Sequence, residues 1–255
     1  MFRQLRILTL LLLLFGVALT TWQTKMRTTD WDASLWMVVY PINGDGSDAS
    51  QHYISSLKES AFTPVEAFLK REANRFGVAV DQPLTVKLAP VLDELPPAPP
   101  QSSNPLMIAW WSLTMRYWAL THNNYDGPSP DIQMFVLYHD PAKNQQVAHS
   151  LGLEKGLIGV VNAYAGKKMA SRNNVVIAHE MLHTVGARDK YDLLDNLPLY
   201  PVGYAEPNRL PLYPQDKAEI MAGRIALSAS EAVMPRGLKS TTVGETTAIE
   251  IRWLR

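Results

Sequence analysis

The pentapeptide His179-Glu180-Met181-Leu182-His183 constrains the fold of this chain more than any other feature. Two histidines four residues apart lie on the same face of an α-helix, because four residues make one turn plus about 40°. Their imidazoles can then share one metal ion, and Glu180 can reach a water on that ion. The apolar residues 175–178 lead directly into the motif. The segment therefore predicts a helix with a metal site on one face.

Composition limits which side chains can bind that metal. The chain has 255 residues, six histidines and no cysteine, so disulfide scaffolds, thiolate zinc sites and cysteine nucleophiles are excluded. Histidines and carboxylates remain as ligands. Lys plus Arg and Asp plus Glu number 24 each, which leaves no basic excess to neutralise phosphates. We therefore expect no nucleic-acid partner.

Two further residues extend the motif. Gly186 stands three residues after His183, where a left-handed turn can end the helix, and Asp189 follows three residues later. The pattern H-E-x-x-H-x-x-G-x-x-D resembles the metzincin clan of zinc metallopeptidases in its Asp-ligand form. The stretch 179–191 is most similar to the snapalysin type, in which Asp replaces the third His and Tyr follows two residues later. This similarity covers 13 of the 255 residues.

The resemblance implies a role for each residue of the motif. It implies that His179, His183 and Asp189 bind Zn²⁺. Glu180 would be the general base in the hydrolysis of a peptide bond by a metal-activated water. Tyr191 would be an oxyanion donor or a close neighbour of the ligands. The expected partner is a peptide or protein substrate, and the motif carries no information on the oligomeric state.

Metzincins share two other features that have candidates in this chain. A methionine lies in a turn beneath the metal, and Met221 in the stretch 219–223 is the candidate, although a packed core methionine explains it nearly as well. The clan also has an edge strand to which substrate pairs as an added strand. The resemblance places residues 157–164 there, and ordinary sheet structure explains that strand equally well.

The third ligand and the function both have alternatives. In a thermolysin-like arrangement the third ligand is a later glutamate, and Glu206 and Glu219 are available. Glu206 precedes Pro207, which argues against a helix at that point. Without metal, the histidines would be structural and Glu180 would be a surface charge. The alternative functions are a zinc amidase acting on a cell-wall or other non-protein amide, and a non-catalytic binding or structural protein that retains the zincin fold.

Helix and strand patterns surround the motif and predict an α/β fold (α+β, zincin-like), with a mixed twisted sheet packed on helices that include the one carrying the motif. Apolar runs rich in β-branched residues predict strands at 35–42, 84–88, 132–138 and 157–164. A proline at the first helical position and a stop at Gly77 predict a helix at 64–76. A second helix at 106–121 carries three tryptophans and is expected to lie buried in the core.

The N-terminus has the pattern of an export signal. Arg3 and Arg6 precede the apolar run 7–22, and a poor cleavage site favours an uncleaved signal anchor over a signal peptide. Residues 1–29 would then form a cytoplasmic tip and a transmembrane helix in the inner membrane. We expect the rest of the chain in the periplasm or outside the cell, and secretion if the signal is cleaved.

The remaining residues, 30–255, are expected to form a single zincin-like metallopeptidase domain. Proline-rich stretches at 96–105 and 197–214 predict loops, because proline fixes φ and lacks the N–H that helices and central strands need.

Overall fold

A five-stranded sheet forms the centre of the protein in the computed structural model, which describes residues 4, 6, 7, 11, 12, 15, 30–100, 104–154 and 156–254. The strand order is β2-β1-β3-β5-β4, and every neighbouring pair is parallel except β4 with β5. The strands are β1 (Leu35–Asn43), β2 (Leu84–Leu88), β3 (Ile132–His139), β4 (Leu151–Leu153) and β5 (Ile158–Tyr164).

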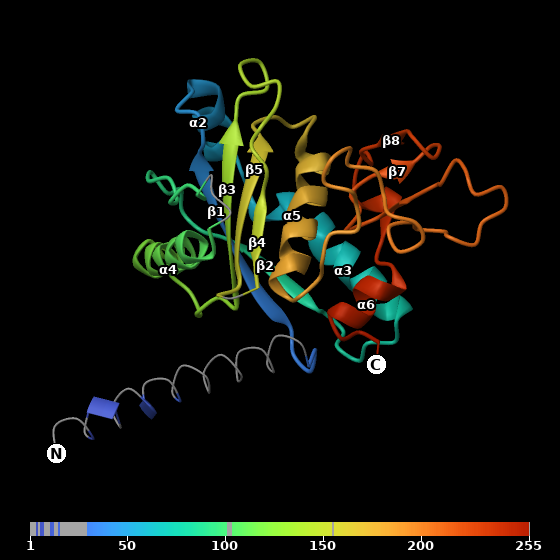
Figure 1. The fold of residues 1–255 in the computed structure, drawn as a ribbon. Coiled ribbons are helices and arrows are strands. Elements are labelled where there is room, and N and C mark those ends of the chain that lie inside the picture. Colours follow the sequence, from blue (N-terminus) through green and yellow to red (C-terminus); the bar gives the residue numbers. More distant parts are fainter. Residues whose placement is uncertain are drawn as a thin grey trace.

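Helices cover both faces of this sheet (Figure 1). The helices and 3₁₀ turns are α2 (Asp48–Ser55), η1 (Glu59–Ala61), α3 (Thr63–Arg75), α4 (Pro105–Thr121), α5 (Ala170–Thr184), η2 (Leu238–Ser240) and α6 (Glu245–Glu250). Helices α3 and α5 pack on one face, and α4 packs on the other. The predicted α/β class, a mixed sheet packed on helices, is confirmed at this level.

Strand β1 shows why the sheet has two covered faces. Its side chains alternate: Met37 and Val39 pack in the cluster with α3 and α5, whereas Val38 and Tyr40 pack in the cluster with α4. All four are fully buried. A parallel strand covered on both sides needs apolar residues at consecutive positions, which is the pattern that predicted this strand from sequence.

Helix α4 lies where the sequence predicted a helix, but the expectation that it is buried in the core is wrong. Only Met115, Trp118 and Ala119 are buried, while Leu106 and Trp110 are 79% and 72% exposed. The helix packs on one face of the sheet through a single apolar stripe, formed by residues three and four positions apart, and its other sides face outward. Its apolar character therefore does not report its burial.

The structure corrects the expectation of a membrane anchor. None of the helices formed by the described residues is both long and apolar enough to cross a membrane. The longest of them, α4, has 17 residues, or about 26 Å, short of the ~30 Å hydrocarbon core. The expected signal anchor, the inner membrane as partner and the location inferred from them are therefore wrong on this finding. Most of the run 7–22, from which they were drawn, lies outside the described residues.

The chain after α5 has little regular structure but is held against the helices. Its strands are β6 (Ala218–Glu219), β7 (Ile225–Ala226), β8 (Ala232–Val233) and β9 (Thr241–Thr242). The parallel pairing of β6 with β9 and the antiparallel pairing of β7 with β8 fix the turn after β6. Residues 96–100 and 197–214 form no helix or strand, as predicted, whereas Pro105, the last residue of the predicted loop 96–105, is the first residue of α4. A single domain over 30–255 stays a prediction.

Candidate metal centre

Helix α5 is fixed beside β5, and this sets the position of the motif. Asn173 accepts a hydrogen bond from the backbone N–H of Tyr164 (3.1 Å) and donates one to its carbonyl oxygen (2.9 Å). Ile177, Met181 and Leu182 are fully buried against the sheet. The opposite side of the same helix carries the two histidines.

His179, His183 and Asp189 converge on one point. The Nε2 atoms of the two histidines are 3.0 Å apart, and Oδ1 of Asp189 is 3.1 Å from each of them. Asp189 reaches this position because the chain reverses after α5. Gly186 makes the turn at a φ of 106°, a value that favours glycine, and the N–H of Ala187 bonds back to the carbonyl of Leu182 (3.0 Å).

Two backbone carbonyls fix the histidine tautomers. Nδ1 of His179 donates to the carbonyl of Ile220 (2.9 Å), and Nδ1 of His183 donates to the carbonyl of Ala187 (2.8 Å). A carbonyl only accepts, so both Nδ1 atoms carry the proton and both Nε2 atoms of the neutral rings present a lone pair. Two lone pairs and a carboxylate oxygen thus face one another, an arrangement that a shared cation stabilises.

The separation of the three ligand atoms fits a small metal ion. A tetrahedral zinc with bonds of about 2.1 Å holds its ligand atoms about 3.4 Å apart. The separations here are 3.0 to 3.1 Å, within a few tenths of an ångström of that value. His179, His183 and Asp189 can therefore hold a metal ion.

The electrostatics of the group also favour a positive charge at its centre. Burial works against a charged His179, but the hydrogen bond with Asp189 and the charge of Glu180 outweigh it and raise the pKa of His179. Burial likewise works against a charged Asp189, yet its hydrogen bonds with both histidines hold its pKa far below the ordinary value. A cation is stabilised here, whether it is a proton or a metal.

Glu180 follows His179 directly in the chain and is buried, with 5% exposure. Burial raises its pKa, although the two histidines act in the opposite direction. No residue in the described part of the chain donates a hydrogen bond to its carboxylate. Both oxygens therefore keep lone pairs that can accept a proton.

Tyr191 also lies close to the centre. Its ring is 6.4 Å from the ring of His179, centroid to centroid. Burial raises the pKa of its phenol, and the charges of Asp189 and Glu180 raise it further. The phenol therefore stays protonated and remains a hydrogen-bond donor at neutral pH.

The turn after β6 lies beneath His179. The backbone carbonyl of Ile220 accepts the hydrogen bond that holds the imidazole of His179. The next residue, Met221, is fully buried, and its backbone carbonyl accepts a hydrogen bond from the N–H of Lys190 (3.0 Å). Sequence reasoning singled out Met221 but missed Ile220. Ile220 acts through its backbone carbonyl, which every residue has, so its side-chain type gives no indication of this role.

The structure does not bring the alternative third ligands to the histidines. Glu219 accepts hydrogen bonds from the N–H groups of Met221, Ala222 and Gly244 and from the hydroxyl of Thr247, at distances of 2.6 to 3.0 Å. Glu206 pairs with Arg209 at 3.2 Å.

The edge strand differs from the expected one. Strand β5 lies inside the sheet between β3 and β4, and β4 is the edge. Gly152 in β4 passes so close to α5 that a Cβ there would collide with Cβ of His183 and with the carbonyl oxygen of Glu180. The Leu-Gly-Leu sequence of β4 is too short to show the alternation that predicts a strand. Its glycine, however, is a signal that another segment approaches the backbone closely.

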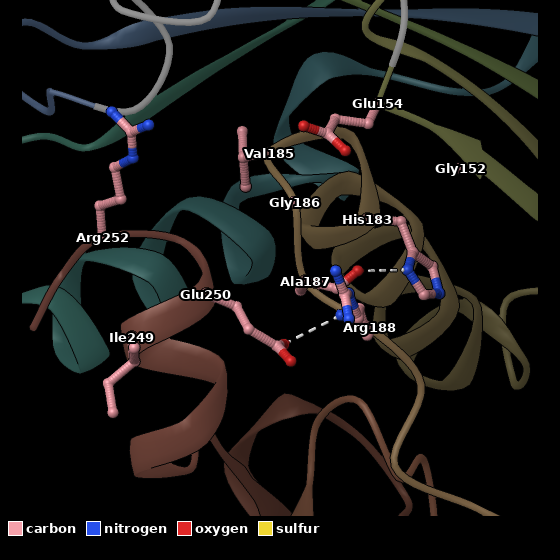
Figure 2. Close-up of a pocket in the computed structure, with 10 residues that line it drawn as sticks. All are labelled: Gly152, Glu154, His183, Val185, Gly186, Ala187, Arg188, Ile249, Glu250 and Arg252. Atoms are coloured by element: carbon pink, nitrogen blue, oxygen red, sulfur yellow. Dashed lines mark hydrogen bonds between the residues drawn. The ribbon is translucent and has the colours of Figure 1, made fainter.

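A pocket of about 650 Å³ opens beside His183. Figure 2 shows Gly152 and Glu154 on one side, residues 185–188 following the end of α5, and Ile249, Glu250 and Arg252 opposite. Sequence reasoning missed this pocket because its walls come from three segments that are about 30 to 100 residues apart in the chain.

Comparison with family models and with curated proteins finds no match. Among solved structures, the chain is similar to OgpA from Akkermansia muciniphila, with 10% sequence identity and a TM-score of 0.35. The similarity covers 84% of this chain and 58% of the OgpA chain, so this chain spans less than two thirds of that protein. A likeness at this level carries no argument about function.

Proposed function

We propose that this chain is a zinc-dependent metallopeptidase of the zincin type, similar to metzincins with an Asp ligand. One observation carries the proposal: three acceptor atoms of His179, His183 and Asp189 face one another within 3.1 Å, beside a carboxylate that no described residue engages. The spacing of the motif and its resemblance to the snapalysin type support zinc as the metal and a peptide as the substrate.

His179, His183 and Asp189 would hold the metal. When bound, zinc lowers the pKa of a water ligand towards neutrality and polarises a carbonyl group. The hydrogen bonds from Nδ1 to the carbonyls of Ile220 and Ala187 hold the two rings in the required orientation.

Glu180 supplies the proton transfer. Its carboxylate takes a proton from the attacking water and returns it to the nitrogen of the leaving amine, so the peptide bond breaks with no net change in the base. Its burial suits this role, because a raised pKa brings a carboxylate closer to the neutral pH at which it must both accept and release a proton. The phenol of Tyr191 can donate to the oxyanion that develops on the substrate carbonyl.

Strand β4 provides a place for the substrate backbone. Only β5 pairs with it among the strands described, so its other edge presents free N–H and C=O groups. An extended peptide can add there as a further strand. The close approach of Gly152 to His183 brings that edge next to the proposed metal.

The test is metal content together with peptide hydrolysis. The purified full-length protein is expected to bind about one zinc per chain and to cleave unstructured peptides, and a chelator should abolish cleavage until zinc is restored. Glu180→Gln should retain zinc and lose cleavage. A protein that never retains zinc, or a Glu180→Gln variant with unchanged activity, would contradict the proposal.

A further inference from the structure

The pocket beside His183 has an uneven charge distribution. Four of its lining residues are charged: Glu154, Arg188, Glu250 and Arg252. Figure 2 shows Arg188 next to Glu250, and Arg252 at the end of the pocket away from His183. Which of these charges is available to a ligand depends on the partners that each one already has.

Both acidic residues already have interaction partners. Oε2 of Glu250 accepts the backbone N–H of Arg188 (3.0 Å) and the ammonium of Lys190 (2.7 Å). Lys190 is only 2% exposed, so this ion pair is held in place and neutralises Glu250. Glu154 also has an interaction partner.

The two arginines differ from these acidic residues. In the part of the chain that the structure describes, the guanidinium groups of Arg188 and Arg252 form no hydrogen bond or ion pair, and both residues are exposed. The protein as a whole has a net charge of zero, so two free guanidinium groups in one pocket are a local feature and not a consequence of composition.

We propose that this pocket binds an acidic side chain of the substrate. The inference rests on the proposed peptidase function and adds a preference to it. Guanidinium groups bind carboxylates through paired hydrogen bonds, more specifically than lysine does. A volume of 650 Å³ equals a sphere about 11 Å across, or about three residues of extended peptide. The preferred Asp or Glu therefore lies within about three residues of the scissile bond.

The first experiment measures cleavage by the zinc-loaded full-length protein. A neutral peptide that it cleaves is varied to Asp, Asn or Lys at each of three positions on either side of the scissile bond. One position is expected to show a kcat/KM about tenfold higher for Asp than for Asn, and lower for Lys than for Asn. Arg188→Glu and Arg252→Glu should each reduce the ratio for Asp over Lys, and together they should reverse it.

Arg236→Glu is the matched control. Arg236 is also an exposed arginine, and its neighbour Gly237 lies against Ser171 near the first turn of α5, about 18 Å along the helix from His183. This charge reversal should leave the ratio for Asp over Lys unchanged. An equal change in the control would show that the protein's overall charge, and not the pocket, sets the preference.

Binding separates this inference from the proposed function. The Glu180→Gln variant is titrated with fluorescently labelled Asp and Asn peptides. The Asp peptide should bind more tightly than the Asn peptide, and the difference in affinity should shrink at high salt. Absence of cleavage with this binding preference intact would overturn the peptidase and leave the acidic pocket ligand standing. Equal cleavage rates for the Asp, Asn and Lys peptides, together with equal binding of the Asp and Asn peptides, would overturn the pocket assignment alone.

Discussion

Glu180 and Glu219 are two glutamates with almost the same burial and opposite surroundings. Both are shielded from solvent, at 5% and 0% exposure, and burial raises the pKa of both. They differ in their hydrogen bonds. Glu219 accepts four, from the turn after β6 and from the start of α6, whereas Glu180 accepts none from the described residues and lies beside the histidines.

This difference is the reason why we propose Glu180 as the general base and a structural role for Glu219. A carboxylate that holds four donors stabilises the backbone around it, because its lone pairs are already used. A buried carboxylate without donors keeps its affinity for a proton. Burial and a raised pKa are common to both glutamates, so the proposed role of Glu180 as general base rests on its free lone pairs.

Exchanging each glutamate for glutamine tests the comparison most directly. Glu180→Gln should lower kcat by about 10³-fold, within the range usual for a lost general base, and should leave the melting temperature close to that of the wild type. Peptide cleavage and differential scanning calorimetry measure the two effects. A large loss of stability in this variant would contradict the assignment of Glu180 as a base without a structural role.

The next largest effect concerns the third ligand. Asp189→Ala should weaken zinc binding by about 100-fold or more, since loss of a direct ligand costs more than the 10- to 100-fold typical of its hydrogen-bond partners. Competition with a chromogenic chelator measures the affinity. Asp81→Ala, on the exposed surface, is the control. If Glu219→Ala weakens zinc binding by this much and Asp189→Ala does not, Glu219 and not Asp189 is the third ligand.

Glu219→Gln should act on stability. In the variant, an NH₂ group would replace one carboxylate oxygen and would face N–H and O–H donors that it cannot bind. The free energy of unfolding should therefore fall by about 2–3 kcal/mol. Urea denaturation measures the change. Because the turn it holds carries the Ile220 carbonyl, any loss of zinc affinity should be smaller than that of Asp189→Ala. Wild-type stability in this variant would refute the structural role.

A third buried glutamate, Glu72, sharpens the comparison through pH. Burial opposes its ionisation, but the N–H of Val243 and the side chains of Arg75, Thr242 and Arg71 outweigh burial and lower its pKa. A folded-state pKa below the unfolded value means that Glu72 stabilises the protein above about pH 4.5, and that this stabilisation is lost as the pH falls through the folded-state pKa.

Glu72→Gln should therefore make stability less dependent on pH. Between about pH 5 and pH 3, the variant should lose about 1–2 kcal/mol less of its free energy of unfolding than the wild type does. Thermal unfolding followed over this pH range measures the slope for wild type and variant. Glu66→Gln provides a control with a partly exposed carboxylate on the same helix. Parallel slopes for Glu72→Gln and the wild type would show that the hydrogen bonds to Glu72 do not lower its pKa.

Strands and helices with a clear apolar pattern could be predicted from sequence. Which segments pack against them, and how far they are buried, could not. The strands at 35–42, 84–88, 132–138 and 157–164 form as predicted, because central parallel strands need long apolar runs. Strand β4 has three residues and shows no period. Helix α4 is apolar on nearly every side, so its sequence could not show that most of it faces outward.

The sequence by itself determined that two histidines share one face of a helix, because a spacing of four residues settles this through local geometry. It also placed Gly186, with its positive φ, where the helix ends. Only the tertiary structure decided what surrounds them. The carbonyl that holds His179 comes from a residue 41 positions away, and the donors that occupy Glu219 come from as far as 28 positions away. Hydrogen bonding and desolvation depend on which distant segments meet, and that is set by packing of the whole chain.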